Sequence, residues 1–243
     1  MDDKENNSLQ KAQAEFISTV SHELRTPLTS IRGFADTLLS AGDKLSEEQK
    51  QKFILIIKEQ ANRLIKLTEN LLAVSKNEIE KLVLKSIDIV PLVENGINLI
   101  SAKSDKNTFE MSVQKNLPFI LVDTDKFQQI ILNILENASK YSNPETTIEV
   151  KLFSTDTEVV ILVEDTGIEI EEKDREKIFE KFTRLSTPLT QKIEGSGLGL
   201  FLTKTLVERM NGKIRAYSEN KKTIFEIKFP ILKYGDEAKA KMK

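Results

Sequence analysis

The most restrictive feature of the sequence is a run of regularly spaced apolar residues in its first third. Steps of four and three residues alternate through this run for three heptads, and a single glutamine interrupts it. The positions are Phe53, Ile57, Gln60, Leu64, Leu67, Leu71 and Val74. This spacing places them along one stripe of a helix, and such a stripe needs a helical partner to cover it. The run therefore predicts a helical hairpin or a coiled coil.

A second apolar stripe lies upstream and predicts the partner helix. Its members are Phe16, Val20, Leu28, Ile31, Ala35 and Leu38. We expect this helix to begin near Leu9 and to end near Ser40. It should bend at Pro27, because proline removes a backbone hydrogen bond. Ser46 precedes acidic residues and is a suitable N-cap for the helix that follows.

Two helices of this kind present more apolar surface than they can cover for each other. The heptads alone fit a plain helical hairpin or a coiled coil, whereas two hairpins paired in a dimeric four-helix bundle would cover the remaining surface. In the bundle we expect Phe16, Val20 and Leu24 to face inward and His22 to face outward.

The upstream helix contains His22, the only histidine in 243 residues. An imidazole is a competent nucleophile near neutral pH. Glu23 follows it directly, and its carboxylate can reach round the helix to hold the second ring proton, which leaves one nitrogen free to attack. A lone histidine is more often a surface residue or a core residue with its hydrogen bonds satisfied. The hypothesis that His22 is a nucleophile therefore depends on the residues around it.

Composition excludes several classes of function. The 36 basic and 38 acidic residues are interspersed and give a net charge of -2, which does not favour nucleic acid or anionic lipid as a partner. The chain has no cysteine and one histidine, which excludes disulfides, thiolate catalysis and a zinc site. Its purely apolar runs reach about five residues, far below the roughly 20 that cross a bilayer. We therefore expect a cytoplasmic segment without membrane contact.

The rest of the chain alternates short β-rich runs with helices, which predicts an α+β fold: a mixed sheet covered by helices on one face. We expect the boundary within 80–86, with a helical hairpin at 1–82, an α/β sandwich at 83–232 and a disordered polar tail at 233–243. The expected strands are 82–89, 109–113, 119–122, 146–153, 158–164, 213–217 and 223–229. The expected helical stretches are 90–102, 125–141, 173–182 and 197–210.

The helix at 125–141 carries polar side chains at helical spacing. Asn133, Asn137 and Lys140 share one face, with Tyr141 beside them. Amide oxygens suit Mg²⁺ and a lysine suits phosphate oxygens, although a polar stripe is also ordinary for a surface helix.

Three further motifs follow in order. Asp165 ends a predicted strand and supplies a carboxylate able to accept from an exocyclic amine, and Gly167 allows close backbone approach. Arg184 closes the motif IFEKFTR and could reach a phosphate. The motif GSGLGL contributes Gly195, Gly197 and Gly199 and opens into a helix, whose N-terminus favours phosphate.

Taken together, these motifs resemble the sensor histidine kinases of bacterial two-component systems. The stretch SHELRTPLT resembles the phosphoacceptor box of that family, and the four later motifs resemble its N, G1, F and G2 boxes. The resemblance extends over 16–230, with both halves in family order. Its phosphoacceptor matches are His22, Glu23, Arg25, Thr26 and Pro27.

The resemblance implies an enzyme with two domains. One is a dimerisation hairpin that forms a four-helix bundle in the homodimer, and the other is an ATP-binding domain of the type shared with gyrase, Hsp90 and MutL. ATP with Mg²⁺ would phosphorylate His22, and the phosphoryl group would pass to an aspartate of a response-regulator receiver domain. Glu23 would be the base or the orienting group, and Thr26 implies a reverse phosphatase activity. Relatives commonly carry a sensor ahead of this point, often membrane-bound, so we expect Met1 to begin a fragment.

The resemblance also assigns the nucleotide contacts. Asn137 would be the Mg²⁺ ligand with Asn133 beside it, and Lys140 and Arg184 would contact phosphates. Asp165 would read adenine. Residues 185–194 would form the ATP lid.

One position departs from the family pattern, because Glu169 stands where a second glycine is usual. If that site needs a positive φ, glutamate there is strained by about 1 kcal/mol or more. The alternative function is therefore a weakly ATP-binding scaffold that dimerises and docks a regulator. A third possibility is an ATP hydrolase acting as a clamp, but Asn133 stands where the hydrolysing relatives carry a glutamate base. Transfer in cis or in trans is left open.

Overall fold

The structure, a computed structural model, describes residues 2–75, 81–103, 106–185 and 197–232. The chain forms two compact units, Met1–Ile79 and Glu80–Lys243.

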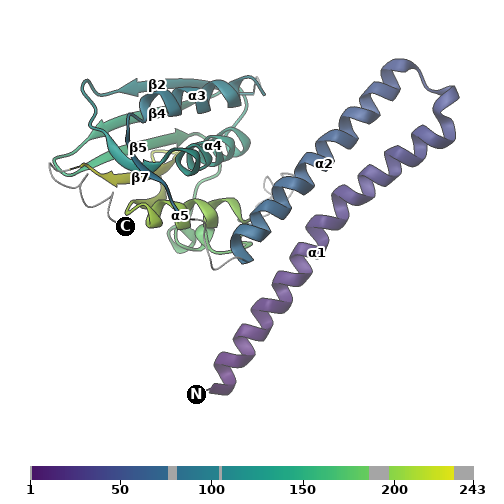
Figure 1. Ribbon diagram of the computed structural model, residues 1–243, viewed down its shortest axis with the longest axis horizontal. Coiled ribbons are helices and arrows are strands. Elements are labelled where there is room, and N and C mark those ends of the chain that lie inside the picture. Colours follow the sequence, from purple (N-terminus) through teal and green to yellow (C-terminus); the bar gives the residue numbers. More distant parts are fainter. Residues whose placement is uncertain (1, 76–80, 104–105, 186–196, 233–243) are drawn as a thin grey trace. The chain divides into compact units, whose positions relative to one another are not determined.

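The first unit is a helical hairpin of α1 (Asp2–Ala41) and α2 (Glu47–Ser75), joined by a 3-10 turn at Gly42–Lys44 (Figure 1). The expected start near Leu9 is wrong, since α1 begins seven residues earlier at Asp2. Residues 2–8 contain no proline or glycine, so nothing in them opposes a helix that is already nucleated. The helix continues through Pro27, which is buried.

The predicted N-cap of α2 is confirmed. The Ser46 hydroxyl accepts a hydrogen bond from the Gln49 backbone N–H at 3.2 Å, and the Gln49 side chain accepts from the Ser46 N–H at 2.9 Å. This reciprocal pair is a capping box, which satisfies two N–H groups that a helix start otherwise leaves free.

The heptad seam of α2 faces α1, as predicted. Leu67 is 6% exposed, and the rings of Phe34 and Phe53 lie 5.1 Å apart between the two helices. A second set of large apolar side chains stays exposed on the single hairpin, including Leu28 at 53%. The others are Ile17, Leu39, Ile54, Leu55, Ile65 and Leu72. The hairpin therefore leaves apolar surface that its own helices do not cover.

The second unit contains a mixed five-stranded sheet with the order β2-β4-β5-β7-β6. Its strands are β2 (Thr108–Val113), β4 (Thr147–Ser154), β5 (Glu158–Asp165), β6 (Lys213–Glu219) and β7 (Lys222–Pro230). The β2–β4 pair is parallel and the other pairs are antiparallel. The first predicted strand does not join this sheet, because β1 (Leu84–Ile87) pairs with β3 (Ile120–Asp123) in a separate two-stranded sheet.

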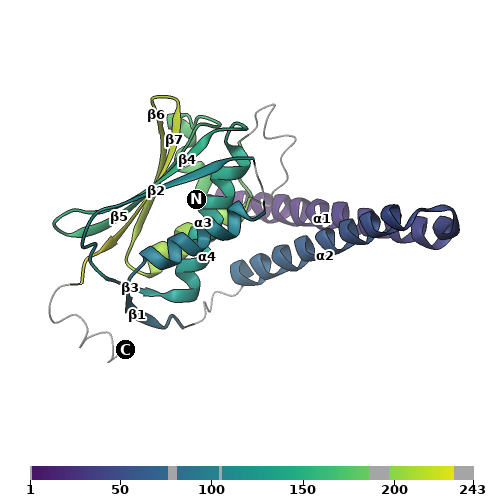
Figure 2. The same cartoon turned by 90° about the horizontal axis from the view of Figure 1, so that it is seen from above.

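Three helices pack on the sheet: α3 (Val90–Ser101), α4 (Thr124–Tyr141) and α5 (Gly199–Arg209). Figures 1 and 2 show them gathered on one face, as the sequence predicts. The apolar side of α4 forms the centre of the core, with Phe127, Ile130, Ile134 and Leu135 fully buried. Alternate side chains of the strands meet it from the sheet, among them Ile148, Val150, Ile161 and Ile227. The polar side of α4 is left at the surface.

The helix expected at 173–182 is wrong. The structure has only two 3-10 turns there, Glu172–Asp174 and Lys177–Phe179. The backbone leaves the helical region at Glu180, and Phe182 adopts a φ of 63°. Ile178 and Phe179 are nevertheless buried. The apolar spacing therefore predicted burial correctly but not the helix.

Candidate active site

The hairpin presents His22 at its surface, as expected from the phase of the stripe. His22 is exposed, whereas Val20 and Leu24 are half-buried. The Thr26 hydroxyl donates to the His22 carbonyl oxygen at 3.2 Å, so it is held along the helix one turn after the imidazole. The side chain of Phe16, also expected to face inward, lies outside the described residues.

Glu23 faces the other helix of the hairpin. Its carboxylate pairs with Arg63 of α2 at 3.2 Å, and both side chains are mostly buried. Sequence reasoning placed Glu23 beside His22 but did not identify Arg63, which lies next to the seam and resembles any other flanking cation.

The start of α4 is fixed by Asp123. Its carboxylate accepts from the backbone N–H groups of Asp125 and Lys126 at 3.1 Å and from that of Val83 at 2.8 Å. Burial alone would raise the pKa of Asp123, but these N–H donors hold it below its usual value. The cap sets where α4 begins and therefore which side chains lie on its polar face.

On that face the two asparagines have different surroundings. Asn133 donates from its amide to the Thr203 hydroxyl of α5 at 2.7 Å, and a Cβ at Gly199 would lie 2.5 Å from its Oδ1. Asn133 thus joins α4 to the start of α5, and its contact with a cofactor stays a prediction. Asn137 is half-buried, and its amide forms no hydrogen bond in the part of the chain that the structure describes. Its oxygen is therefore available as a ligand.

Two cations lie near Tyr141 at the end of α4: Lys140 of the same helix and Arg184 of a later segment. The Lys140 ammonium lies 5.3 Å from the centre of the Tyr141 ring. Burial raises the pKa of the Tyr141 hydroxyl, and the nearby charge of Arg184 opposes that rise. The structure therefore places Lys140, Tyr141 and Arg184 together, although Arg184 is 43 residues away in the chain.

Asp165 is a buried carboxylate at the end of β5, with 2% of its surface exposed. Burial raises its pKa to about 7, against the hydrogen bond from the Gly167 N–H and the charge of Lys106. The loop that follows is tied to β6 and β7: the Ile170 N–H donates to the Ser218 hydroxyl at 2.7 Å, and the Thr223 hydroxyl donates to the Ile168 carbonyl at 2.7 Å. The carboxylate is thus held at the end of a strand, and the loop that follows it is fixed by these two hydrogen bonds.

The raised pKa of Asp165 predicts a pH dependence of stability. Between its ordinary value of 3.8 and about 7, the folded chain holds a proton that the unfolded chain has lost, so the free energy of unfolding falls as pH rises across this window. The slope is at most about 1.4 kcal/mol per pH unit. Urea unfolding of the nucleotide-free chain at pH 5, 6, 7 and 8 measures it. Asp165→Asn should lose this part of the slope, and equal slopes in both proteins would contradict the prediction.

Gly167 is required by close packing. A Cβ at this position would lie 2.2 Å from the Tyr141 carbonyl oxygen and 2.7 Å from a carboxylate oxygen of Asp165. Both neighbours belong to the site, so a side chain here must displace either the end of α4 or the buried carboxylate.

We expect Gly167→Ala to lower the free energy of unfolding by about 1–3 kcal/mol, as overpacking usually does, and to weaken nucleotide binding. Tyrosine fluorescence isolates the second unit, because all three tyrosines lie in its span and the chain has no tryptophan. Gly33→Ala, where a Cβ meets nothing within 4 Å, lies in the first unit and should leave the tyrosine transition of the second unit unchanged. An unchanged unfolding midpoint in Gly167→Ala would show that the packing is looser than described.

The F and G2 motifs are joined through the backbone. The Phe182 N–H donates to the Gly197 carbonyl at 2.9 Å, and Gly197 has a φ of 65°. A Cβ at Gly197 would lie 2.6 Å from the Phe182 backbone. These contacts bring together the two ends of the predicted lid, of which 186–194 lies outside the described residues together with Gly195. The polar tail, 233–243, lies outside them as well.

Lys106 is a residue of the site that sequence reasoning missed. Its ammonium donates to the carbonyl oxygens of Ser139 and Lys140 at 3.1 Å and of Ser142 at 2.7 Å. It therefore caps the negative end of α4 while its charge acts on Asp165. Nothing in the sequence marks it, because it lies in a loop remote from every motif.

The strain expected at Glu169 is wrong. Its φ is not positive, and its side chain is exposed. The loop therefore accepts a residue other than glycine here, and the argument for a weakened scaffold loses its main support.

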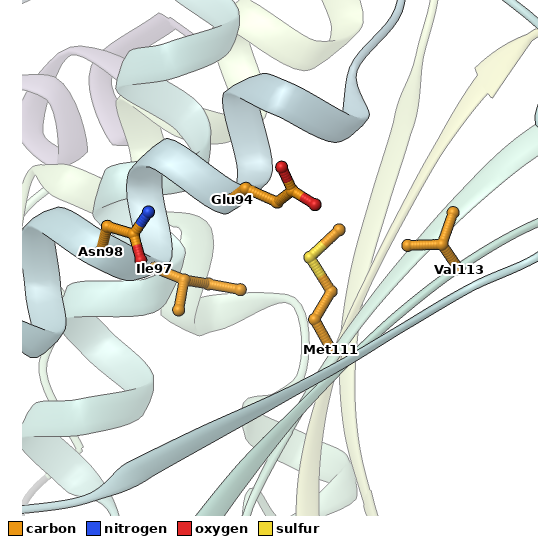
Figure 3. A pocket seen from close by; sticks show the side chains of 5 residues that line it. All are labelled: Glu94, Ile97, Asn98, Met111 and Val113. Atoms are coloured by element: carbon orange, nitrogen blue, oxygen red, sulfur yellow. The ribbon is translucent and has the colours of Figure 1, made fainter.

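A pocket of about 290 Å³ lies between α3 and the edge strand β2 (Figure 3). Its lining residues are Glu94, Ile97, Asn98, Met111 and Val113. None of the predicted nucleotide contacts lines it, so it is separate from the site described above.

Two parts of the sequence match known families in the order of the two units. Residues 12–80 match the His Kinase A (phospho-acceptor) domain, and residues 122–233 match the histidine kinase-, DNA gyrase B- and HSP90-like ATPases. The chain belongs to the two-component sensor histidine kinases. The sensor protein kinase WalK of Staphylococcus saprophyticus is 35% identical over 239 residues, which are 96% of this chain and 39% of WalK. This histidine-kinase chain thus spans about two fifths of that relative's length.

Solved structures of histidine kinases share the fold. Full-length ShkA in complex with AMPPNP has a TM-score of 0.66 at 27% identity, covering 90% of this chain and 46% of ShkA. ThkA in complex with the response regulator protein TrrA has a TM-score of 0.71 at 23% identity, covering 94% of this chain and 65% of that one. Among the residues described for this histidine-kinase chain, no helix combines the length and apolar character that a membrane span requires.

Proposed function

We propose that this chain is a histidine kinase core that transfers the γ-phosphoryl group of ATP to His22. The proposal rests on the combination of two units in one chain. One is a phosphoacceptor hairpin with an exposed histidine, and the other is an ATPase-type unit whose polar side chains gather at α4, β5 and α5. Because ATP is supplied in the cytoplasm, we propose that the reaction takes place there.

The nucleotide contacts divide into two groups. Asp165 accepts from the exocyclic amine of adenine, and its ionised form accepts more strongly than its protonated form, so ATP affinity should rise with pH through about 7. Lys140 and Arg184 neutralise phosphate oxygens, and the N-terminal end of α5, with the positive end of its dipole, faces the phosphate chain. The Gly197 backbone, held against Phe182, gives that start its shape.

The donor set is compatible with Mg²⁺. Magnesium is usually bound by one or two protein oxygens together with substrate phosphates and water, and Asn137 offers an amide oxygen with no partner among the described residues. When bound there, the ion would neutralise charge on the phosphates, as phosphoryl transfer requires. The protein contributes positioning and charge, with the ring nitrogen of His22 as the nucleophile and Glu23 holding the other ring proton.

We propose that the active form is a homodimer with a four-helix bundle. The exposed apolar side chains of the hairpin support this arrangement, since a second hairpin would cover what α1 and α2 leave open. The same dimer would present His22 at its outer surface.

The acceptor of the phosphoryl group is proposed to be an aspartate of a response-regulator receiver domain. ThkA, which shares this fold, has been crystallised with a response regulator. Thr26, held one turn after His22, is proposed to serve the reverse dephosphorylation of the regulator.

The experiment is incubation of the chain with γ-labelled ATP and Mg²⁺, followed by addition of a receiver domain. We expect label on the protein that is lost in acid and retained in alkali, and its transfer to the receiver within the time of the assay. Label that is stable in acid would indicate a serine or threonine ester and would contradict the proposal.

A further inference from the structure

An ion pair joins the two helices of the hairpin. Arg63 Nη2 lies 3.2 Å from Glu23 Oε2, and the side chains are 23% and 17% exposed. The pair joins α1 to α2 across 40 residues of sequence. It therefore lies beside the phosphoacceptor and within a single unit of the structure.

The pair separates Glu23 from the imidazole that it is expected to serve. Neighbouring residues on a helix point about 100° apart, and here Glu23 faces α2 while His22 is exposed. Within the described residues, Arg63 is the only polar partner of the Glu23 carboxylate, and the His22 ring has none. One carboxylate oxygen is thus bound on the inner side of α1 while the ring is on the outer side.

We propose that Arg63 is a positioning residue for the phosphoacceptor: it holds Glu23 against α2 and withholds the carboxylate from the His22 ring until the phosphoryl transfer. The regulatory part of this proposal rests on the proposed autophosphorylation, whereas the arrangement of the three side chains does not.

The size of the effect follows from the exposure of the pair. Ion pairs that water still reaches are worth little, and their loss changes an equilibrium by a factor of about two to five. Without Arg63, a mostly buried carboxylate lacks a partner, and the adjacent ring N–H is the donor nearest in sequence. Arg63→Met should therefore increase, by that factor, the ratio of molecules in which Glu23 contacts the His22 ring to molecules in which it does not.

Nitrogen NMR of the imidazole tests the arrangement without any activity. Because His22 is the only histidine, its two ring-nitrogen signals need no assignment to a residue, and once Nδ1 is distinguished from Nε2 they report which nitrogen carries the proton. A carboxylate that accepts from Nδ1–H favours the Nδ1–H tautomer. We expect Arg63→Met to raise the ratio of Nδ1–H to Nε2–H about two- to five-fold, and the double variant Arg63→Met, Glu23→Gln to lose this rise. Arg63→Lys and the control Lys58→Met, an exposed cation of the same helix, should match the parent.

Glu23→Gln provides a second test that does not depend on how Arg63→Met folds. If the carboxylate is withheld from the ring, the tautomer ratio of Glu23→Gln equals that of the parent. A higher proportion of Nδ1–H in the parent than in Glu23→Gln would show that Glu23 already holds the ring, and it would overturn the proposal. An unchanged ratio in a folded Arg63→Met protein would overturn it as well.

The kinetic test uses γ-labelled ATP. Arg63→Met should autophosphorylate about two- to five-fold faster than the parent at saturating ATP, with an unchanged KM for ATP, and Lys58→Met should match the parent. A slower Arg63→Met would overturn the regulatory part of the proposal. A parent that takes up no label on His22 would instead contradict the proposed function, and the tautomer ratios would still decide the position of Glu23.

Discussion

Replacing His22 by alanine is expected to abolish the uptake of label from γ-labelled ATP while nucleotide binding stays unchanged. The chain has no other imidazole and no cysteine, and its lysines and arginines are protonated near neutral pH and therefore poor nucleophiles, so no other side chain is expected to take up an acid-labile phosphoryl group. The nucleotide contacts belong to the second unit, whereas His22 belongs to the first. This variant should therefore bind a fluorescent ATP analogue with the affinity of the parent and take up no label.

The matched control for His22→Ala is Ser21→Ala. Ser21 is exposed next to the histidine, and its hydroxyl is the other nucleophile nearest to the imidazole in sequence. It should be labelled like the parent. Loss of label in Ser21→Ala with full label in His22→Ala would identify the serine as the acceptor and would refute the assignment of the phosphoacceptor.

Asn137→Ala should reduce Mg²⁺-dependent autophosphorylation by about 100-fold or more, because one fixed ligand or dipole at a developing charge is commonly worth that much. The fold should not change, since the Asn137 amide forms no hydrogen bond in the described part of the chain. The loss should appear in kcat, with nucleotide binding in the absence of Mg²⁺ little altered. Rates over a Mg²⁺ titration, together with the unfolding midpoint, measure both effects.

Gln129→Ala is the control for Asn137→Ala, because Gln129 is an exposed amide on the same helix. It should keep the parent rate. If Asn137→Ala keeps the parent rate at every Mg²⁺ concentration, Asn137 is not the metal ligand, and the ligand must be sought among the other polar side chains of the site.

The sequence predicts much of this structure where a local pattern sets the outcome. The heptads of α2 identify the buried seam because burial follows directly from the 3.6-residue period. The runs at 146–153 and 158–164, rich in Ile, Val and Thr and separated by a short turn, predict the β4–β5 pair, because β-branched residues favour strands and a short turn favours a hairpin. The outward position of His22 follows from the phase of its own helix.

The errors occur where tertiary contacts override the local pattern. The apolar spacing at 173–182 is compatible with a helix, but the chain must turn at Phe182 to reach Gly197, and this turn prevents a regular helix. The pairing of β1 with β3, rather than with the main sheet, is likewise set by packing and not by any local signal. At Glu169 a family pattern suggested a strain that the backbone does not have.

Some residues of the candidate site could be predicted from the sequence, and others could not. Its motif residues could be named because each lies in a recognisable arrangement of glycines, amides or a histidine. Lys106 and Arg63 could not be named, because each acts through a partner that is remote in sequence and each looks like an ordinary surface cation. Such residues become visible only when the fold brings α4, or the first helix of the hairpin, next to them.

Transfer of the γ-phosphoryl group to His22 is tested by locating the phosphate after the parent chain is incubated with ATP and Mg²⁺. Phosphorus NMR under alkaline conditions, with mass spectrometry of the peptide that contains His22, gives the answer. We expect one phosphoramidate per phosphorylated chain, on His22, which disappears in acid. Release of inorganic phosphate with no phosphorus bound to the protein would contradict this expectation and would identify the chain as an ATP-hydrolysing clamp.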